Sequence, residues 1–335
     1  MTPTIHLHIG EPKSGTTYLQ AMLDENRKAL EAAGLLTPGP REQIRAAQDA
    51  IRRRSDGELW QALADKLLAW SGPTALVSME TLCRAHPSAV KRAVNAFGDA
   101  DVRVHVTARD VLRSLPAQWQ QSTQHRKTWT WPEYSGAVIR GDKHHPATSN
   151  FWSQHDLEAM LDRWAKVVGV ENVHVVTVPQ SGADPQQLWG RFAESLDLPP
   201  VELRAVQPSN EALGEVSAEL MRRVNQAVEP LELTERQYNQ TVRAILARDV
   251  LAPRRAAEPK VLPPPEAGPW ADRESRRIVD AVSASGAQVI GDLDDLRPIA
   301  AEFSDAAGLP TDSELVDAAV DAVRGLVHVL ALKKN

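Results

Sequence analysis

The chain has 335 residues, 42% of them hydrophobic and 24% charged, a composition typical of a soluble globular protein. Its 38 basic and 44 acidic residues give a formal net charge of −6, which argues against general nucleic-acid binding because that function needs a basic face. No run approaches the about 18 apolar residues of a membrane-spanning helix. A single cysteine, Cys83, excludes an internal disulfide, and no targeting segment precedes the first strand, so we expect a cytoplasmic protein.

Alternating apolar residues predict a short strand from Ile5 to Ile9, and a glycine-containing loop and a helix to about Gly34 follow it. The later elements expected are two helices within 41–70, a strand at 74–78, a helix at 86–97, a strand at 102–107, a helix to about 125, a strand at 173–178 and a helix at 186–195. Strands that alternate with helices predict an α/β fold, a three-layer structure around a parallel sheet.

The sequence changes character after about residue 205. We expect helices at 211–228, 234–248 and 312–332, and an extended proline-rich segment at 252–268. This predicts a first domain at 1–205 and a helical C-terminal extension at 206–335 that packs on it. The polar stretch 138–154 is expected to be an irregular loop, a lid or a wall of a substrate site.

The loop after the first strand predicts a phosphate site, because a strand–loop–helix directs backbone N–H groups and the positive end of a helix dipole at one point. Gly10 and Gly15 have the spacing of the nucleoside-triphosphate loop, but Thr16 occupies the place of its lysine. The lysine stands three residues earlier, at Lys13. No apolar strand ends in the usual metal-holding aspartate; the strand at 102–107 leads to Arg109, which suits a phosphate better.

Residues 12–17, Pro-Lys-Ser-Gly-Thr-Thr, are followed by Tyr18 and Leu19. This run resembles the 5′-phosphosulfate loop of sulfotransferases that use 3′-phosphoadenosine 5′-phosphosulfate (PAPS). The resemblance implies that Lys13 binds the 5′-phosphate and stabilises charge on the bridging oxygen as the sulfuryl group departs. It also implies that the residues after Lys13 cradle the phosphate without a metal; these are Ser14, Gly15, Thr16 and Thr17.

The same family holds the 3′-phosphate with a strand-end arginine and with a serine eight residues later. Arg109 matches the arginine, whereas Ala117 stands at the serine position. Either Ser114 or Gln118 replaces the serine, or the 3′-phosphate is held mainly by arginines, with Arg113 as a second candidate. The C-terminal R-K-G-x-x-G-D-W element of animal cytosolic sulfotransferases is missing, so the resemblance is firm over residues 4–35 and weak beyond about 200.

A general base in this family is a histidine or a glutamate, and it must lie where parallel strands end. Glu80, just after the strand at 74–78, is the first candidate; capping of the following helix is its alternative role. His86 is expected to start a helix, and His6 and His8 to be packed or hydrogen-bonded. No ligand spacing at His144 and its neighbour supports a metal site.

These features predict a sulfotransferase that moves the sulfuryl group from PAPS to a hydroxyl or amine of a small-molecule or glycan acceptor. One alternative is a phosphotransferase of the P-loop class. Another is a degenerate nucleotide-binding module that acts through a protein partner. The alanine-rich helix at 312–332 is expected to pack either internally or against a second copy in a homodimer.

Overall fold

A computed structural model describes residues 2–52, 56–207, 212–299, 302–305 and 310–332. Its contacts divide the chain into two compact units. The first comprises Met1–Val111, Trp152–Ser209 and Asp272–Ile299, and the second Leu112–Phe151, Asn210–Ala271 and Ala300–Asn335. This division by contacts does not test which segments fold as separate domains. The domain expected at 1–205 and the extension expected at 206–335 therefore stay a prediction.

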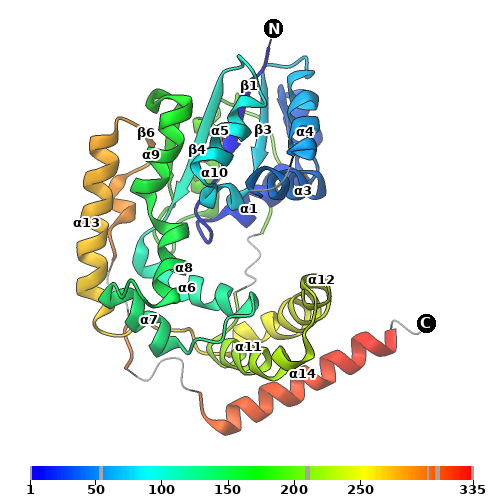
Figure 1. Ribbon diagram of the computed structural model, residues 1–335, viewed down its shortest axis with the longest axis vertical. Coiled ribbons are helices and arrows are strands. Elements are labelled where there is room, and N and C mark those ends of the chain that lie inside the picture. Colours follow the sequence, from blue (N-terminus) through cyan, green and yellow to red (C-terminus); the bar gives the residue numbers. More distant parts are fainter. Residues whose placement is uncertain (1, 53–55, 208–211, 300–301, 306–309, 333–335) are drawn as a thin grey trace. The chain divides into compact units, whose positions relative to one another are not determined.

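The first unit is built on a six-stranded parallel sheet with the order β2-β3-β1-β4-β5-β6. The strands are β1 (Thr4–His8), β2 (Leu35–Leu36), β3 (Thr74–Ser78), β4 (Val102–Ala108), β5 (Val173–Thr177) and β6 (Gln288–Ile290). The predicted α/β fold with a parallel sheet is therefore confirmed. Two edge strands, β2 and β6, were not expected, because two and three residues are too few to show an alternating pattern. Figure 1 shows β1 between β3 and β4.

Helices cover this sheet. They are α1 (Thr16–Glu25), α2 (Arg27–Ala32), α3 (Pro40–Ile51), α4 (Glu58–Leu68), η1 (Glu80–Arg84), α5 (Pro87–Asn95), α9 (Leu157–Val168), η2 (Val170–Asn172), α10 (Pro185–Ser195) and η6 (Leu293–Leu296). Leu19 and Met22 of α1 share one buried cluster with Leu76 of β3 and Phe192 of α10. On the other face α9 packs on β4 and β5 and contacts α5. Burial of these apolar faces is the main force that holds the layers together.

The helices of the first unit begin in different ways. Asp156 and Asp184 cap α9 and α10, because each side chain accepts a hydrogen bond from a backbone N–H of the first turn. His86 caps α5 in the same way, as its predicted role at a helix start required. Helix α1 differs: its N-cap is Gly15, no side chain caps it, and no acidic residue lies in its first turn. The positive end of its helix dipole, at the N-terminus, is therefore not balanced by a side-chain cap or an acidic residue of its own first turn.

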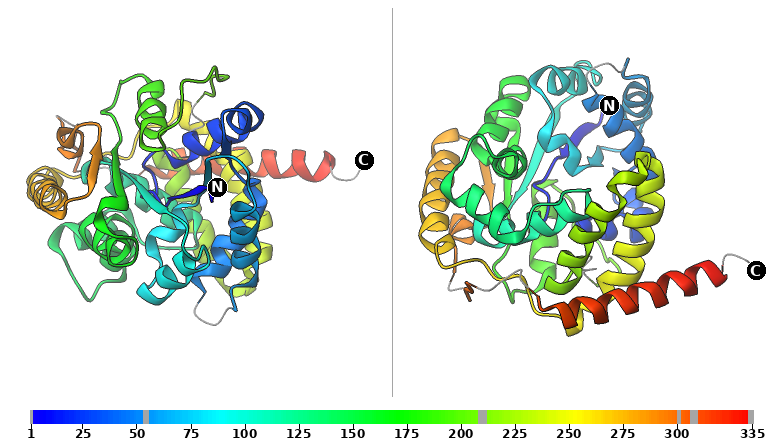
Figure 2. Two further views of the ribbon diagram at one scale, coloured as in Figure 1. Left: turned by 90° about the horizontal axis from the view of Figure 1, so that it is seen from above. Right: turned by 60° about the horizontal axis from the view of Figure 1, so that its bottom comes forward.

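The second unit is helical. It contains α7 (Trp131–Arg140), α11 (Glu215–Val228), η3 (Glu229–Leu231), α12 (Glu235–Tyr238), the π-helix η4 (Asn239–Leu251), η5 (Ala252–Ala257) and α14 (Asp312–Leu332), with parts of α6 (Val111–Gln124), α8 (Pro146–His155) and α13 (Ala267–Ser285). Its core includes the rings of Trp119 and Trp131, whose centroids are 5.5 Å apart. In both views of Figure 2, α14 extends beyond the other helices of this unit. None of the described helices is both long and apolar enough to cross a membrane.

The expectation of an irregular loop over 138–154 is wrong. Helix α7 continues to Arg140, and α8 begins at Pro146. Gly141, with φ of 65°, ends the first helix in the left-handed conformation that favours glycine, and proline suits the first turn of the second. The glycine that ends one helix and the proline that begins the next both lie in a polar stretch. The polar composition of this stretch therefore suggested a loop where the structure has two helices.

Candidate phosphate-binding site

The loop between β1 and α1 packs tightly against the side chains at the carboxyl end of the central strand. A Cβ atom on Gly10 would lie 2.7 Å from Thr107 Oγ1, 2.7 Å from Thr16 Cγ2 and 2.9 Å from His8 Nε2. Real Cβ atoms are essentially never found this close to other atoms. Glycine at this position therefore lets the backbone lie directly on the side chains beneath it.

A chain of hydrogen bonds lies under the loop. Ser14 donates its hydroxyl proton to the Glu11 carbonyl at 2.5 Å, so its Oγ accepts from Thr107 Oγ1, 2.6 Å away. With its proton used, Thr107 Oγ1 accepts from His8 Nε2 at 3.1 Å, and His8 Nδ1 accepts from Ser78 Oγ at 2.8 Å. In this chain each hydroxyl and the imidazole donate one hydrogen bond. The proton of a neutral His8 therefore lies on Nε2.

The electrostatics of the strand histidines agree with this assignment. Burial lowers the pKa of His8 from 6.5 to about 3, so the ring is neutral near pH 7. His6 lies on the same strand with Nδ1 2.8 Å from His105 Nε2, and burial, with Arg103 as the next cause, lowers its pKa to about 4. The prediction that His6 and His8 are packed or hydrogen-bonded is confirmed, since both are buried and both form hydrogen bonds.

Two cationic residues meet at the loop. Lys13 has φ of 66°, a left-handed conformation that is uncommon for a residue with a side chain. Arg109, which follows β4, donates from Nη1 to the main-chain carbonyl oxygen of Lys13 at 2.9 Å. The strand end and the loop, which the sequence separates by 96 positions, are thereby joined.

The start of α1 supplies the third part of the site. Gly15 has φ of 81°, and a Cβ atom there would lie 2.3 Å from Leu188 Cδ2. Thr16 is buried and Thr17 is exposed, whereas Ser14 has no exposed surface and its hydroxyl is engaged inside the loop. Ser14 therefore holds the loop together. The uncapped N–H groups that follow it, with Lys13 and Arg109 nearby in the fold, form an arrangement suited to an anion.

A buried carboxylate below the loop went unnoticed in the sequence. Glu11 is 3% exposed, and its Oε2 lies 3.3 Å from Nδ1 of His155, which is 1% exposed. Burial is the largest influence on the Glu11 carboxyl and raises its pKa, while His155 acts in the opposite direction. No local pattern in the sequence could have revealed the pair, because 144 positions separate its members.

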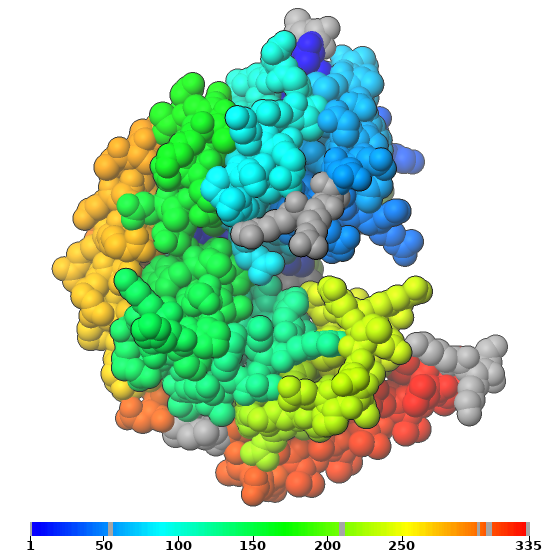
Figure 3. Space-filling view, viewed as in Figure 1, coloured from blue at the N-terminus to red at the C-terminus, as the bar shows by residue number. Residues whose placement is uncertain are grey.

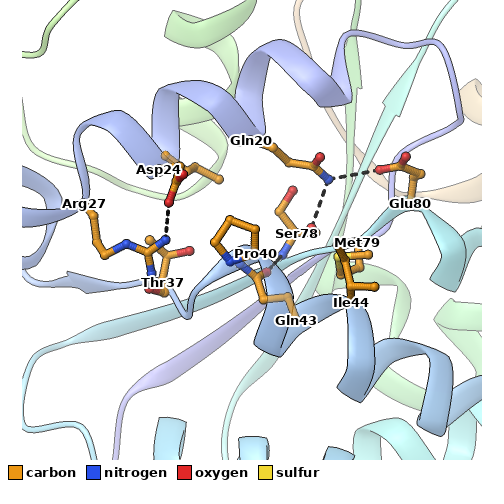
Figure 4. Close-up of a pocket in the computed structure, with 11 residues that line it drawn as sticks. Gln20, Asp24, Arg27, Thr37, Pro40, Gln43, Ile44, Ser78, Met79 and Glu80 are labelled. Atoms are coloured by element: carbon orange, nitrogen blue, oxygen red, sulfur yellow. Dashed lines mark hydrogen bonds and ion pairs between the residues drawn. The ribbon is translucent and has the colours of Figure 1, made fainter. Parts of the chain in front are cut away.

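Glu80, the predicted base, begins the short helix η1 directly after β3. Gln20 of α1 donates from Nε2 to Glu80 Oε2 and to the carbonyl oxygen of Ser78, both at 3.0 Å. Figure 4 shows the side chains of Gln20 and Glu80 directed toward each other. Within the described part of the chain, Gln20 is the hydrogen-bond partner of this carboxylate, so Oε1 can accept from a bound molecule.

Glu80 lines a pocket of about 170 Å³ between α1, α3 and the end of β3 (Figure 4). Arg27 pairs with Asp24 at 2.5 Å and donates to the Thr37 carbonyl at 2.7 Å, so its charge is already balanced. The other residues that line the pocket are Gln20, Leu23, Pro40, Gln43, Ile44, Ser78 and Met79. Such a pocket suits a small molecule with an apolar body and one polar group directed at Glu80.

Ser114, the proposed substitute for the 3′-phosphate serine, lies on the first turn of α6 and is 1% exposed. It belongs to the second compact unit, whereas Arg109 belongs to the first. Cys83 is fully buried, and burial raises the pKa of its thiol to about 12, which makes it an inert packing residue. No group of three metal-ligating side chains occurs among the described residues.

No protein-family model and no curated protein matches the chain. Solved structures that resemble it include two sulfotransferases. A sulfotransferase from Alicyclobacillus acidocaldarius is 15% identical, with a TM-score of 0.43 over 71% of this chain and 99% of that chain. A sulfotransferase domain from the curacin biosynthetic pathway is 15% identical, with a TM-score of 0.36 over 63% of this chain and 78% of that chain. A likeness at this level says nothing about activity.

Proposed function

We propose that the protein transfers a sulfuryl group from PAPS to a hydroxyl or amine of a small-molecule or glycan acceptor. The observation that carries the proposal is the start of α1: an uncapped helix N-terminus preceded by Lys13, whose carbonyl is held by Arg109. Helix N–H groups and two nearby cations favour a doubly charged phosphate ester over a neutral ligand.

The residues of the loop fit the 5′ end of such a nucleotide. Glycine is required at Gly10 by its close approach to the side chains of Thr107 and His8, and at Gly15 by its left-handed conformation and the nearby Leu188. Lys13 and Thr17 would hold the 5′-phosphate, with the buried Thr16 contributing through its backbone. Arg109 stands at the end of β4 beside the loop, and its planar fork of N–H donors suits a phosphate, so it would also meet the 3′-phosphate. PAPS, when bound, supplies the sulfuryl group.

The transfer needs a proton acceptor and a positive charge beside the leaving oxygen. Glu80 would accept the proton that the acceptor loses as its oxygen or nitrogen bonds to sulfur. Gln20 holds Glu80 in place through Oε2, which leaves Oε1 to take the proton. Lys13 would stabilise the charge that grows on the phosphate oxygen as its bond to sulfur breaks.

Calorimetric titration tests the nucleotide part of this proposal. Adenosine 3′,5′-bisphosphate, adenosine 5′-monophosphate and ATP are each titrated into the full chain without added metal. We expect the bisphosphate to bind at least tenfold more tightly than the monophosphate, about 1.4 kcal/mol of discrimination. Equal binding of the two would contradict recognition of a 3′-phosphate. Activity that depends on ATP and magnesium would instead favour a phosphotransferase.

Lys13→Ala provides the matched variant, with Lys28→Ala as its control because Lys28 is an exposed lysine on α2. Lys13→Ala is expected to abolish turnover of PAPS with any acceptor found by screening and to leave the fold intact, since the side chain is only partly buried. Wild-type turnover in Lys13→Ala would refute the role of this lysine.

A further inference from the structure

Helix α14 of the second unit has two apolar faces, and only one of them is covered. Leu315, Ala318 and Ala322 are buried, and the helix packs on α11 and η4. On the outer side, five large apolar side chains are each 60 to 62% exposed: Val316, Val320, Val323, Val327 and Leu330. Of the twelve exposed large apolar side chains among the described residues, six lie on this helix. Contiguous apolar surface of this kind marks an interaction site.

The spacing of the exposed residues identifies the kind of partner. They follow one another at intervals of four, three, four and three, which is the heptad pattern of a helix that pairs with another helix. The buried residues fall on the opposite side of the same helix. Figure 3 shows α14 (orange to red) with its outer surface uncovered by the neighbouring helices of its unit. The exposed face is therefore a helix-pairing seam of about two heptads.

We infer that this seam pairs with the same seam of a second copy of the chain, in antiparallel orientation. A twofold axis near the middle of the seam places Val316 opposite the partner's Val327, and Val320 opposite the partner's Val323. Each of these four layers then buries two valines, while Leu330 lies at the end of the seam opposite the partner's Ser313. The interface is self-complementary, as twofold symmetry requires.

Charge complementarity selects the antiparallel orientation. Asp317 and Arg324 flank the seam, and the antiparallel register brings each against the other residue of the partner, which gives two ion pairs. A parallel pairing would instead place Asp312 against the partner's Asp317, two like charges, and would leave Arg324 facing an alanine. Arg324 also bonds Asp321 of its own helix at 2.8 Å, but it is 79% exposed and can reach a partner.

An anionic membrane is a poorer occupant of this face. Between residues 312 and 332 there are four acidic residues and one arginine, a net charge of −3 with His328 neutral. Interfacial helices that bind anionic lipid carry lysine and arginine on the polar side. The acidic flanks of α14 would be repelled by such a surface.

Sedimentation of the full chain over a range of concentrations tests the dimer and its register together. Asp317→Arg and Arg324→Asp are each expected to weaken dimerisation by about tenfold, because like charges then face one another. The double exchange, Asp317→Arg with Arg324→Asp, is expected to restore it. Loss of the bond from Arg324 to Asp321 within one helix would not be rescued by the second change, so recovery reports contact between copies.

Cysteine cross-linking distinguishes the orientations. In the antiparallel register, Val316→Cys alone does not cross-link, whereas a mixture of Val316→Cys and Val327→Cys chains forms the mixed disulfide. The two positions are eleven residues apart, about 16 Å along one helix, so they cannot join within a chain. The native Cys83 is fully buried and does not interfere. Cross-linking of Val316→Cys to itself would overturn the antiparallel pairing.

A chain that stays monomeric at all concentrations would overturn the proposal. So would a dimer that persists in Val320→Asp, because a buried carboxylate at the centre of the seam is expected to weaken pairing by about a hundredfold. Circular dichroism of each variant shows that the helices remain folded. Co-sedimentation of the wild type with vesicles of anionic phospholipid, lost in Val320→Asp, would assign the face to a membrane instead.

Discussion

Arg109 donates a hydrogen bond of 2.9 Å from Nη1 to the main-chain carbonyl oxygen of Lys13. That carbonyl belongs to a residue with φ of 66°, a conformation that costs free energy when a side chain is present. The bond stabilises the backbone turn at Lys13. Arg109 therefore supports the shape of the loop and also adds positive charge to the site. Loss of Arg109 should therefore affect the site in two ways.

Replacement of Arg109 by lysine keeps the charge and removes the planar fork of donors. We expect Arg109→Lys to weaken binding of adenosine 3′,5′-bisphosphate by about ten- to a hundredfold, since lysine cannot hold the Lys13 carbonyl and a phosphate together. Calorimetry on Arg109→Lys and on Arg41→Lys, an exposed arginine of α3, provides the measurement and its control. Equal affinity in the two variants would remove Arg109 from the site.

Glu80 and Gln20 allow binding and catalysis to be separated. We expect Glu80→Gln to lower turnover by a factor of about a hundred and to leave nucleotide affinity unchanged, because an amide cannot accept the acceptor's proton. Gln20→Ala should lower turnover less, since it removes the group that orients the carboxylate. Initial rates and calorimetry on both variants test this. A selective loss of nucleotide binding in Glu80→Gln would exclude the base role.

Replacement of two glycines of the first unit by alanine is expected to change the free energy of unfolding in opposite directions. Gly10→Ala places a Cβ atom within 3 Å of three atoms beneath the loop and should lower the free energy of unfolding by about 1–3 kcal/mol. Gly190 lies within α10 and has nothing within 4 Å of its Cβ position, so Gly190→Ala should stabilise by about 1 kcal/mol. Urea denaturation measures both. Unchanged stability in Gly10→Ala would mean that the loop shifts at little cost.

Acid should destabilise the fold through its buried histidines. The pKa of His8 is about 3 in the folded protein and 6.5 when exposed, so below pH 6.5 the unfolded state binds a proton that the folded state does not. Stability therefore falls as pH drops from 6.5 toward 3, by about 2 kcal/mol for His8 between pH 7 and 5. The raised pKa of Glu11 acts in the opposite direction below its folded value.

The shape of this pH dependence, and not the stability at one pH, identifies the histidine. Urea denaturation at pH 7 and pH 5 is compared for the wild type and for His8→Gln, whose amide does not titrate. The loss of stability between the two pH values should be about 2 kcal/mol smaller in the variant. An identical loss in both proteins would assign the acid sensitivity to other groups.

Much of the fold could be predicted from the sequence, because its signals are local. Alternation marked β1 and β4, a short apolar run marked β3, and helical spacing marked α14 at the bounds the structure has. Lys13 and Gly15 were identified as candidates because a phosphate loop is a continuous run of residues. The polar stretch 138–154 shows the limit: its composition suggested a loop, but Gly141 and Pro146 separate two helices there.

The sequence by itself determined the strand, the loop and the helix, since each depends on neighbours within a few positions. Only the tertiary structure decided what supports them. Thr107 lies 93 positions from Ser14 and His8 lies 70 from Ser78, yet one hydrogen-bond chain joins them. The physical reason is that parallel strands bring their carboxyl ends to one edge, where the buried side chains of Ser14, Thr107, His8 and Ser78 satisfy one another's hydrogen bonds.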